Sequence, residues 1–188
     1  LNTINLKYGI LKKKNLKIKS IKHQASSRGA LKKTQLKNNM NLESMNTQQA
    51  WDLVGGLSKP SKMPGWAYGL PAKECKTGSK LRDIKGSTCH GCYALKGCYV
   101  FPVVQAAQYR RLASITHPLW SGAMQLLINS KKSKVFRWHD SGDVQDESHL
   151  MNIFAVAKLS PSVRHWLPTR EAWVKHFLNL GPDNLVIR

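Results

Sequence analysis

Regular spacing of apolar residues begins near residue 100 and predicts three helices. Residues 103–115 and 119–129 each follow a proline, which suits the first turn of a helix. A third helix is predicted after Asp146, whose side chain can cap it. Its apolar side chains fall at the i, i+3, i+4 and i+7 positions, which place them on one helix face: Leu150, Ile153, Phe154 and Ala157.

Short apolar runs alternate with these helices and predict strands. KVFRWHD reads as a strand, SVRHWLPTR as a second strand ended by Pro168, and NLVIR as a third. Between the last two, EAWVKHFLNL predicts a helix that stops at Gly181. We expect His165 and Trp166 to pack in the core. Strand and helix alternation predicts an α/β fold with parallel strands and crossover helices, either an open doubly wound sheet or part of a (β/α) barrel.

The stretch from Gly55 to Gly97 lacks this regularity. It is rich in Gly, Pro, Ser and Lys, which is the composition of a loop, and it is long for a compact domain. A bound cofactor would explain how such a loop is ordered. At the other end, the chain stops inside the apolar run NLVIR, so we expect the domain to be truncated at its C-terminus.

Charge divides the chain into two parts. The net charge is +20, and residues 1–45 hold eleven of the 30 Lys and Arg but one of the ten acids. We expect this leader to be upstream sequence, a disordered tail or a basic arm, and residues 46–188 to form the α/β domain. Basic surface makes nucleic acid a possible partner. No apolar run approaches a membrane span, which favours a cytoplasmic protein.

Three of the four cysteines lie in the loop-like stretch, and the fourth directly follows it. Cys89 and Cys92 form a C-x2-C pair, Cys98 follows, and Cys75 lies fourteen residues upstream of Cys89. In a reducing compartment such a cluster favours metal binding over disulfides. Four thiolates suit zinc or an iron–sulfur cluster equally, and free thiols without a ligand are the alternative.

Polar residues gather where the predicted strands end. His139, Asp140 and Asp143 follow the first strand in RWHDSGDVQDE. Chemistry in parallel α/β proteins collects at the carboxyl ends of strands, so these three are candidate catalytic residues. A turn followed by a helix cap is the alternative, and is favoured for Asp146 and Glu147. The later strand ends carry Thr169, Arg170, Glu171 and Arg188.

These motifs in succession resemble the phage gene product 88 family. TCHGCYALKG, RWHDSGD and LPTRE carry the resemblance, which covers about residues 55–188. It implies a phage protein of the host cytoplasm with a cysteine centre, plausibly iron–sulfur. Cys75, Cys89 and Cys92 match the family's cysteines. Cys98 stands where relatives can carry another residue, so the resemblance implies that a fourth ligand can lie downstream.

The order of motifs is also similar, more weakly, to radical S-adenosylmethionine enzymes. In those enzymes a cysteine loop precedes a partial (β/α) barrel with a glycine-containing acidic motif after the second strand. Their usual spacing is C-x3-C-x2-C, whereas this chain has C-x2-C-x5-C from Cys89 to Cys98.

The leading hypothesis is an iron–sulfur protein with a ligand-binding face at the strand ends. In it, Cys75, Cys89, Cys92 and Cys98 bind the metal. Around the ligand we expect proton exchange at His139, Asp140 and Asp143, and anion binding at Arg170. Glu171 is a further candidate catalytic residue. The alternatives are a zinc-stapled nucleic-acid-binding module and a host-interaction protein without chemistry.

Overall fold

The computed structural model describes residue 42 and residues 44–188. Residues 45–188 form one compact unit. The predicted basic leader, residues 1–45, lies almost wholly outside the described residues.

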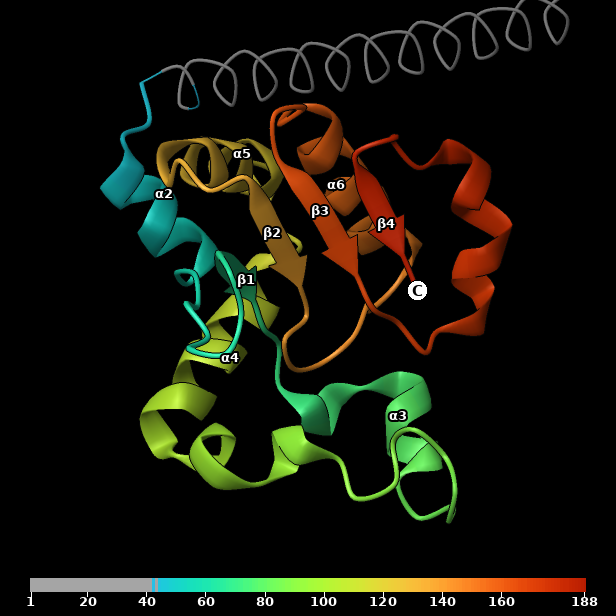
Figure 1. Ribbon diagram of the computed structural model, residues 1–188. Coiled ribbons are helices and arrows are strands. Elements are labelled where there is room, and N and C mark those ends of the chain that lie inside the picture. The colour runs from blue at the N-terminus through green and yellow to red at the C-terminus, as the bar shows by residue number, and fades with distance from the viewer. Residues whose placement is uncertain (1–41, 43) are drawn as a thin grey trace, which may run out of the picture. The chain divides into compact units, whose positions relative to one another are not determined.

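A four-stranded parallel sheet organises this unit (Figure 1). Its strands are β1 (Trp66–Tyr68), β2 (Val135–Trp138), β3 (Arg164–Leu167) and β4 (Leu185–Ile187), paired in the order in which they occur in the chain. The predicted α/β fold with parallel strands is confirmed. Each strand lies beside the next one in the chain, as in a (β/α) barrel. In a doubly wound sheet the strand order changes direction at a switch point.

The predicted helices are present and pack against the sheet. They are α4 (Pro102–Ser114), α5 (Trp120–Ser130) and α6 (Glu147–Lys158). A further helix, α2 (Thr47–Val54), was not predicted and packs beside α5. Asp146 caps α6 as predicted, since its side chain accepts a hydrogen bond from the His149 N–H at 2.8 Å. The predicted helix before β4 forms instead as the 3-10 helix η4 (Ala172–Leu180). Among its residues only Val174 is buried, so it lacks the packed face that stabilises most α-helices.

Side chains of one face of the sheet form the core with the helices. Tyr68, Trp138 and Leu167 are fully buried there, and the Tyr68 hydroxyl donates to the Val54 carbonyl at 2.8 Å. His165 is buried, as predicted. The prediction for Trp166 was wrong: its side chain is 38% exposed. Successive side chains of a strand point to opposite faces, so a buried His165 places Trp166 on the face away from the helices.

The stretch read as a long loop contains regular structure that the sequence did not predict. It includes β1, helix α3 (Lys76–Leu81) and the 3-10 turns η1 (Ala72–Glu74), η2 (Tyr93–Leu95) and η3 (Gly97–Val100). β1 is too short to show an alternating pattern. We call residues 69–101 the cysteine segment; it lies beyond the carboxyl ends of the strands (Figure 1).

Across the described part of the chain, none of the helices combines the length and apolar character that a membrane crossing requires.

Candidate functional site

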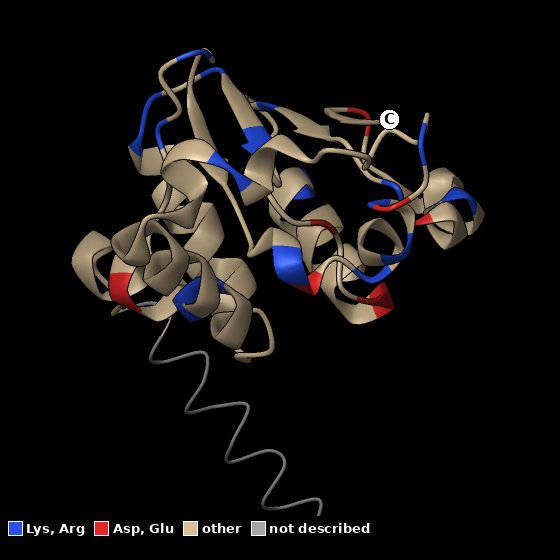
Figure 2. Ribbon diagram, turned by 90° about the horizontal axis from the view of Figure 1, so that it is seen from below, with Lys and Arg blue, Asp and Glu red and all other residues tan. Residues whose placement is uncertain are grey.

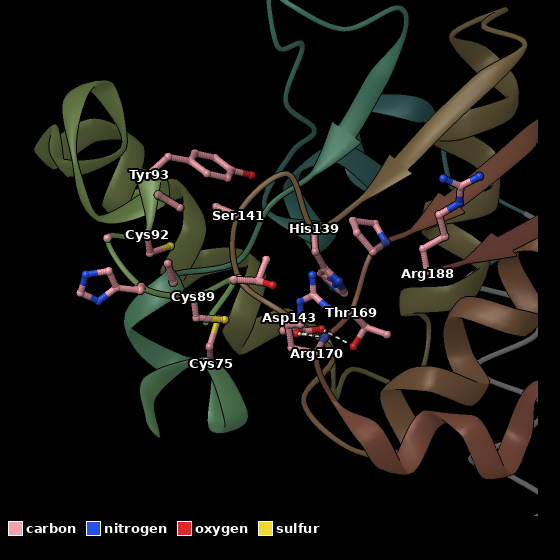
Figure 3. A pocket seen from close by; sticks show the side chains of 18 of the residues that line it. Cys75, Cys89, Cys92, Tyr93, His139, Ser141, Asp143, Thr169, Arg170 and Arg188 are labelled. Atoms are coloured by element: carbon pink, nitrogen blue, oxygen red, sulfur yellow. Dashed lines mark hydrogen bonds between the residues drawn. The ribbon is translucent and has the colours of Figure 1, made fainter. Parts of the chain in front are cut away.

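The carboxyl ends of the strands and the cysteine segment enclose a cavity of about 420 Å³ (Figure 3). β1 leads into the cysteine segment, β2 into the turn that begins at His139, and β3 into residues 168–171. Because all strands are parallel, these connections meet at one edge of the sheet. The functional side chains among those lining the cavity are Cys75, Cys89, Cys92, Tyr93, Arg137, His139, Asp143, Thr169, Arg170 and Arg188.

Three of the four cysteines share this cavity. Cys75 precedes α3, while Cys89 and Cys92 lie in the turns before η2. Gly78 lies beside two of them: an added Cβ there would lie 3.7 Å from the Cys75 sulfur and 3.5 Å from the Cys89 sulfur. Cys98 is exposed and lies outside the cavity lining. The structure thus brings together the three cysteines that the family resemblance matched.

The four thiols are free, and burial raises the pKa of two of them. None of the four forms a disulfide. Burial raises the pKa of Cys75 to about 12, with smaller contributions from Asp143 and the neighbouring thiols. Burial also raises the pKa of Cys89, while Arg170 lowers it. Raised pKa values do not suit a nucleophilic or redox-active thiol, whereas a metal ion displaces the protons on binding.

No group of three or more metal-ligating side chains is preassembled within the described residues. The cavity does contain both thiols and positive charge. Three free thiols face one cavity, and three arginine residues line the same cavity and can offset the negative charge of an anionic cluster: Arg137, Arg170 and Arg188.

His139 lies at the centre of the cavity wall with both ring nitrogens unpaired. The side chain is 3% exposed, and neither Nδ1 nor Nε2 has a hydrogen-bond partner. Its backbone adopts a φ of 57°, and its N–H donates to the Tyr68 carbonyl at 2.8 Å. Burial holds the pKa of the imidazole well below its usual range, so the ring is neutral. Both nitrogens are themselves buried, and the ring packs against His149, so His139 forms part of the cavity wall without presenting a hydrogen-bonding group to the cavity.

Asp143 joins the ends of β2 and β3. Its Oδ1 accepts from the Val144 N–H and the Thr169 hydroxyl, both at 2.7 Å, and its Oδ2 accepts from the Arg170 N–H at 2.8 Å (Figure 3). Burial raises its pKa although these donors lower it. A carboxylate accepts about four hydrogen bonds, so Asp143 retains roughly one for a ligand. These hydrogen bonds hold the turn that carries Arg170 against the end of β2.

Asp140 lies outside the cavity lining. Burial raises the pKa of its carboxyl, and the nearest opposing charges are those of Arg111 and Arg137. Its backbone carbonyl accepts from the Tyr93 hydroxyl at 2.6 Å. The geometry therefore gives Asp140 a part in holding the cysteine segment onto β2, and the predicted proton exchange there stays a prediction.

Glu171 is buried beside the cavity and anchors the helix that follows Cys75. Its carboxylate accepts from the Thr77 N–H and the Thr77 hydroxyl, each at 2.9 Å, and from Trp173 Nε1 at 3.1 Å. Glu171 was predicted as a catalytic residue, and that role stays a prediction. Its contacts with Thr77 hold the helix that follows Cys75.

Three residues of the site were not singled out from the sequence: Thr77, Tyr93 and Arg137. Nothing in the sequence around Thr77 indicates a partner ninety-four residues away. Arg137 did carry a signal. It stands between the buried Phe136 and Trp138, so strand alternation places it on the opposite face.

Comparison with known protein families agrees with the motif resemblance. A family model described as gene product 88 matches residues 25–188. The chain belongs to the gene product 88 family. Neither a curated protein nor a solved structure matches it. The family match begins at residue 25, within the predicted leader, and spans the cysteine segment and all four strands.

Proposed function

We propose that this gene product 88 family member binds an iron–sulfur cluster through Cys75, Cys89 and Cys92. The observation that supports this most directly is the convergence of three free thiols and three arginines on one cavity at the carboxyl edge of a parallel sheet. Bound there, a cluster would supply electron transfer or a Lewis-acidic iron. Its stability requires a reducing compartment such as the host cytoplasm.

The chain's own residues shape a ligand site beside the three thiols. Arg170 and Arg188 can bind a carboxylate or phosphate group, since a guanidinium matches either in two-point geometry. His139 contributes a buried, neutral ring to the cavity wall. Asp143 holds Arg170 in place through the backbone N–H. A small anionic ligand with a polar centre fits this arrangement.

S-Adenosylmethionine is the specific ligand that we propose for this site, because it carries a carboxylate next to an ammonium group. Support comes from the order of elements: the cysteines follow β1, and a turn with Asp143 and a left-handed Gly142 follows β2 in an unreversed parallel sheet. The spacing from Cys75 to Cys89 departs from the usual cysteine motif of enzymes that use this ligand.

The test is metal analysis of anaerobically purified full-length protein. We expect iron and sulfide in matching amounts and broad visible absorption, both lost in a Cys89→Ser/Cys92→Ser double variant. Cys98→Ser is the matched control, because Cys98 is exposed and outside the cavity, and it should retain the metal.

Two results would contradict the proposal. Equal iron content in the double variant and the wild type would mean that the thiols do not bind it. A colourless protein with one equivalent of zinc, lost in the same double variant, would establish a structural zinc site instead. If iron is present, a change in the cluster spectrum on adding S-adenosylmethionine tests the ligand separately.

A further inference from the structure

Among the described residues, no helix covers the second face of the sheet (Figure 1). On this face β2, β3 and β4 place Arg137, Trp166 and Val186 in one row, and Val135 beside Arg164 in the next. Trp166 is 38% exposed and Val186 is 42% exposed. Parallel sheets are usually covered on both faces, so an exposed face with a large aromatic ring is unusual. We call the surface formed by these five residues the open face.

The open face is a basic groove. It contains a depression of about 390 Å³ whose lining includes Arg137, Arg164 and Arg188 together with Trp166, and no Asp or Glu. The strands themselves carry basic residues and no acidic ones (Figure 2). Charge complementarity therefore selects an anionic partner.

Arg137 and Trp166 form a flat, charged stack within this groove. The Arg137 guanidinium lies 4.7 Å from the centre of the Trp166 ring. Its terminal nitrogens donate to the Met63 sulfur at 2.8 Å and to the Tyr93 hydroxyl at 3.4 Å. Its Nε is buried and has no hydrogen-bond partner. The stack thus offers a charged aromatic surface, while the unpaired Nε lies beneath it.

We infer that the open face binds single-stranded nucleic acid, with a base stacked at Trp166 and Arg137 and phosphates held by Arg164 and Arg188. Aromatic rings interleaved with basic side chains on a sheet are the chemistry by which proteins bind single strands. A duplex hides the faces of its bases, so it can reach the arginines but not the ring. An acidic peptide would pair with the arginines and leave the stack without a planar partner.

The open face is continuous with the cysteine cavity, because Arg137 and Arg188 line both. A strand bound on the sheet would therefore pass beside Cys75, Cys89 and Cys92. That such a strand is the substrate of the metal centre rests on the proposed function. Binding itself rests on the open face alone.

The experiment measures fluorescence anisotropy of a labelled single-stranded oligonucleotide with the full-length protein. We expect binding that weakens with salt, with Trp166→Ala lowering the affinity about tenfold. Arg164→Ala should lower it less and reduce the steepness of the salt dependence, since it removes one phosphate contact. Both side chains are exposed, and circular dichroism would verify that the variants fold.

Lys175→Ala/Leu178→Ala is the matched control, because it removes one exposed charge and one exposed apolar side chain from η4. This variant should bind within about twofold of the wild type. Equal affinity of the Trp166→Ala variant and the wild type would overturn the inference and assign binding to another surface, such as the basic leader. Absence of binding at about 50 mM salt, or tighter binding of duplex than of single strand, would overturn it as well.

The Cys89→Ser/Cys92→Ser variant separates the two proposals. We expect it to bind the oligonucleotide within about twofold of the wild type whether or not it holds metal. Loss of binding in this variant would overturn the assignment to the open face. Its metal content, measured on the same sample, tests the proposed function independently.

Discussion

The α/β body and the cysteine segment are stabilised in different ways. In the body, fully buried side chains such as Trp120, Trp138 and Leu150 form one continuous core. In the cysteine segment, the buried apolar side chains are Leu70, Pro71, Ala72 and Ala94, two of which are single methyl groups. Specific hydrogen bonds to the strand ends fix its position instead. The body is therefore ordered by packing, whereas the order of the segment depends on a few polar contacts and on what its thiols bind.

The largest effect should come from removing a core ring of the body. Trp138 is fully buried and contacts the rings of Tyr68, Trp120 and Phe136. We expect Trp138→Ala to lower the free energy of unfolding by about 3–5 kcal/mol, because it leaves a cavity that the core cannot close. Urea denaturation would measure the loss.

Trp166→Ala is the matched control for this change. It removes the same side chain from the open face, where Trp166 is 38% exposed, so its cost should be smaller by about 2 kcal/mol or more. If both variants lost the same free energy of unfolding, Trp166 would be as buried as Trp138. The difference between the core face and the open face of the sheet would then be contradicted.

A smaller, local effect should come from the contact between Thr77 and Glu171. Thr77→Val keeps the shape of the side chain but removes the hydroxyl that donates to the buried carboxylate at 2.9 Å. We expect amide hydrogen exchange in the cysteine segment to become faster, because the free energy of its local opening falls by about 1.5–3 kcal/mol. Exchange in the strands should change little. Hydrogen exchange followed by mass spectrometry would resolve the two regions.

Ser79→Ala provides the control, because the Ser79 hydroxyl donates within its own helix to the Lys76 carbonyl. Its exchange rates should change little. If Thr77→Val accelerated exchange equally in the strands and in the cysteine segment, the two regions would unfold as one unit and the distinction between them would fail.

The sequence predicted the body well because packing leaves a periodic signal. The apolar spacing around Leu150 and Phe154 located α6, and Asp146 was identified as its cap. The same reasoning gathered His139, Asp143 and Arg170 at one edge, because parallel strands place their carboxyl ends together.

The sequence could not predict the contacts that shape the cysteine segment. The bond from Thr77 to Glu171 and the bond from the Tyr93 hydroxyl to the Asp140 carbonyl join residues more than forty positions apart. Each is one polar contact without a periodic pattern. β1 was missed because three residues are too few to show alternation. The exposure of Trp166 depends on which face the helices cover, and local sequence does not encode that.

The smallest effect concerns acid stability and belongs to the body. Trp138 Nε1 donates to His165 Nδ1 at 3.2 Å, so that nitrogen carries no proton. Nε2 therefore carries the hydrogen and donates to the Ser160 hydroxyl at 3.0 Å. Burial lowers the pKa of His165 to about 4, below the value of about 6.5 expected in the unfolded chain.

Between these two pKa values the unfolded chain binds the proton and the folded chain does not. The stability contributed by neutral His165 is thus complete above about pH 6.5 and is lost as the pH falls toward about 4. From pH 7 to pH 5, the wild type should lose on the order of 1–2 kcal/mol more than a His165→Gln variant, measured by urea denaturation at each pH. The other buried histidines and carboxyls are common to both proteins, so they cancel in this difference. Equal losses would mean that His165 is also protonated in the folded chain at pH 5, and would contradict both the neutral ring and the hydrogen bond from Trp138.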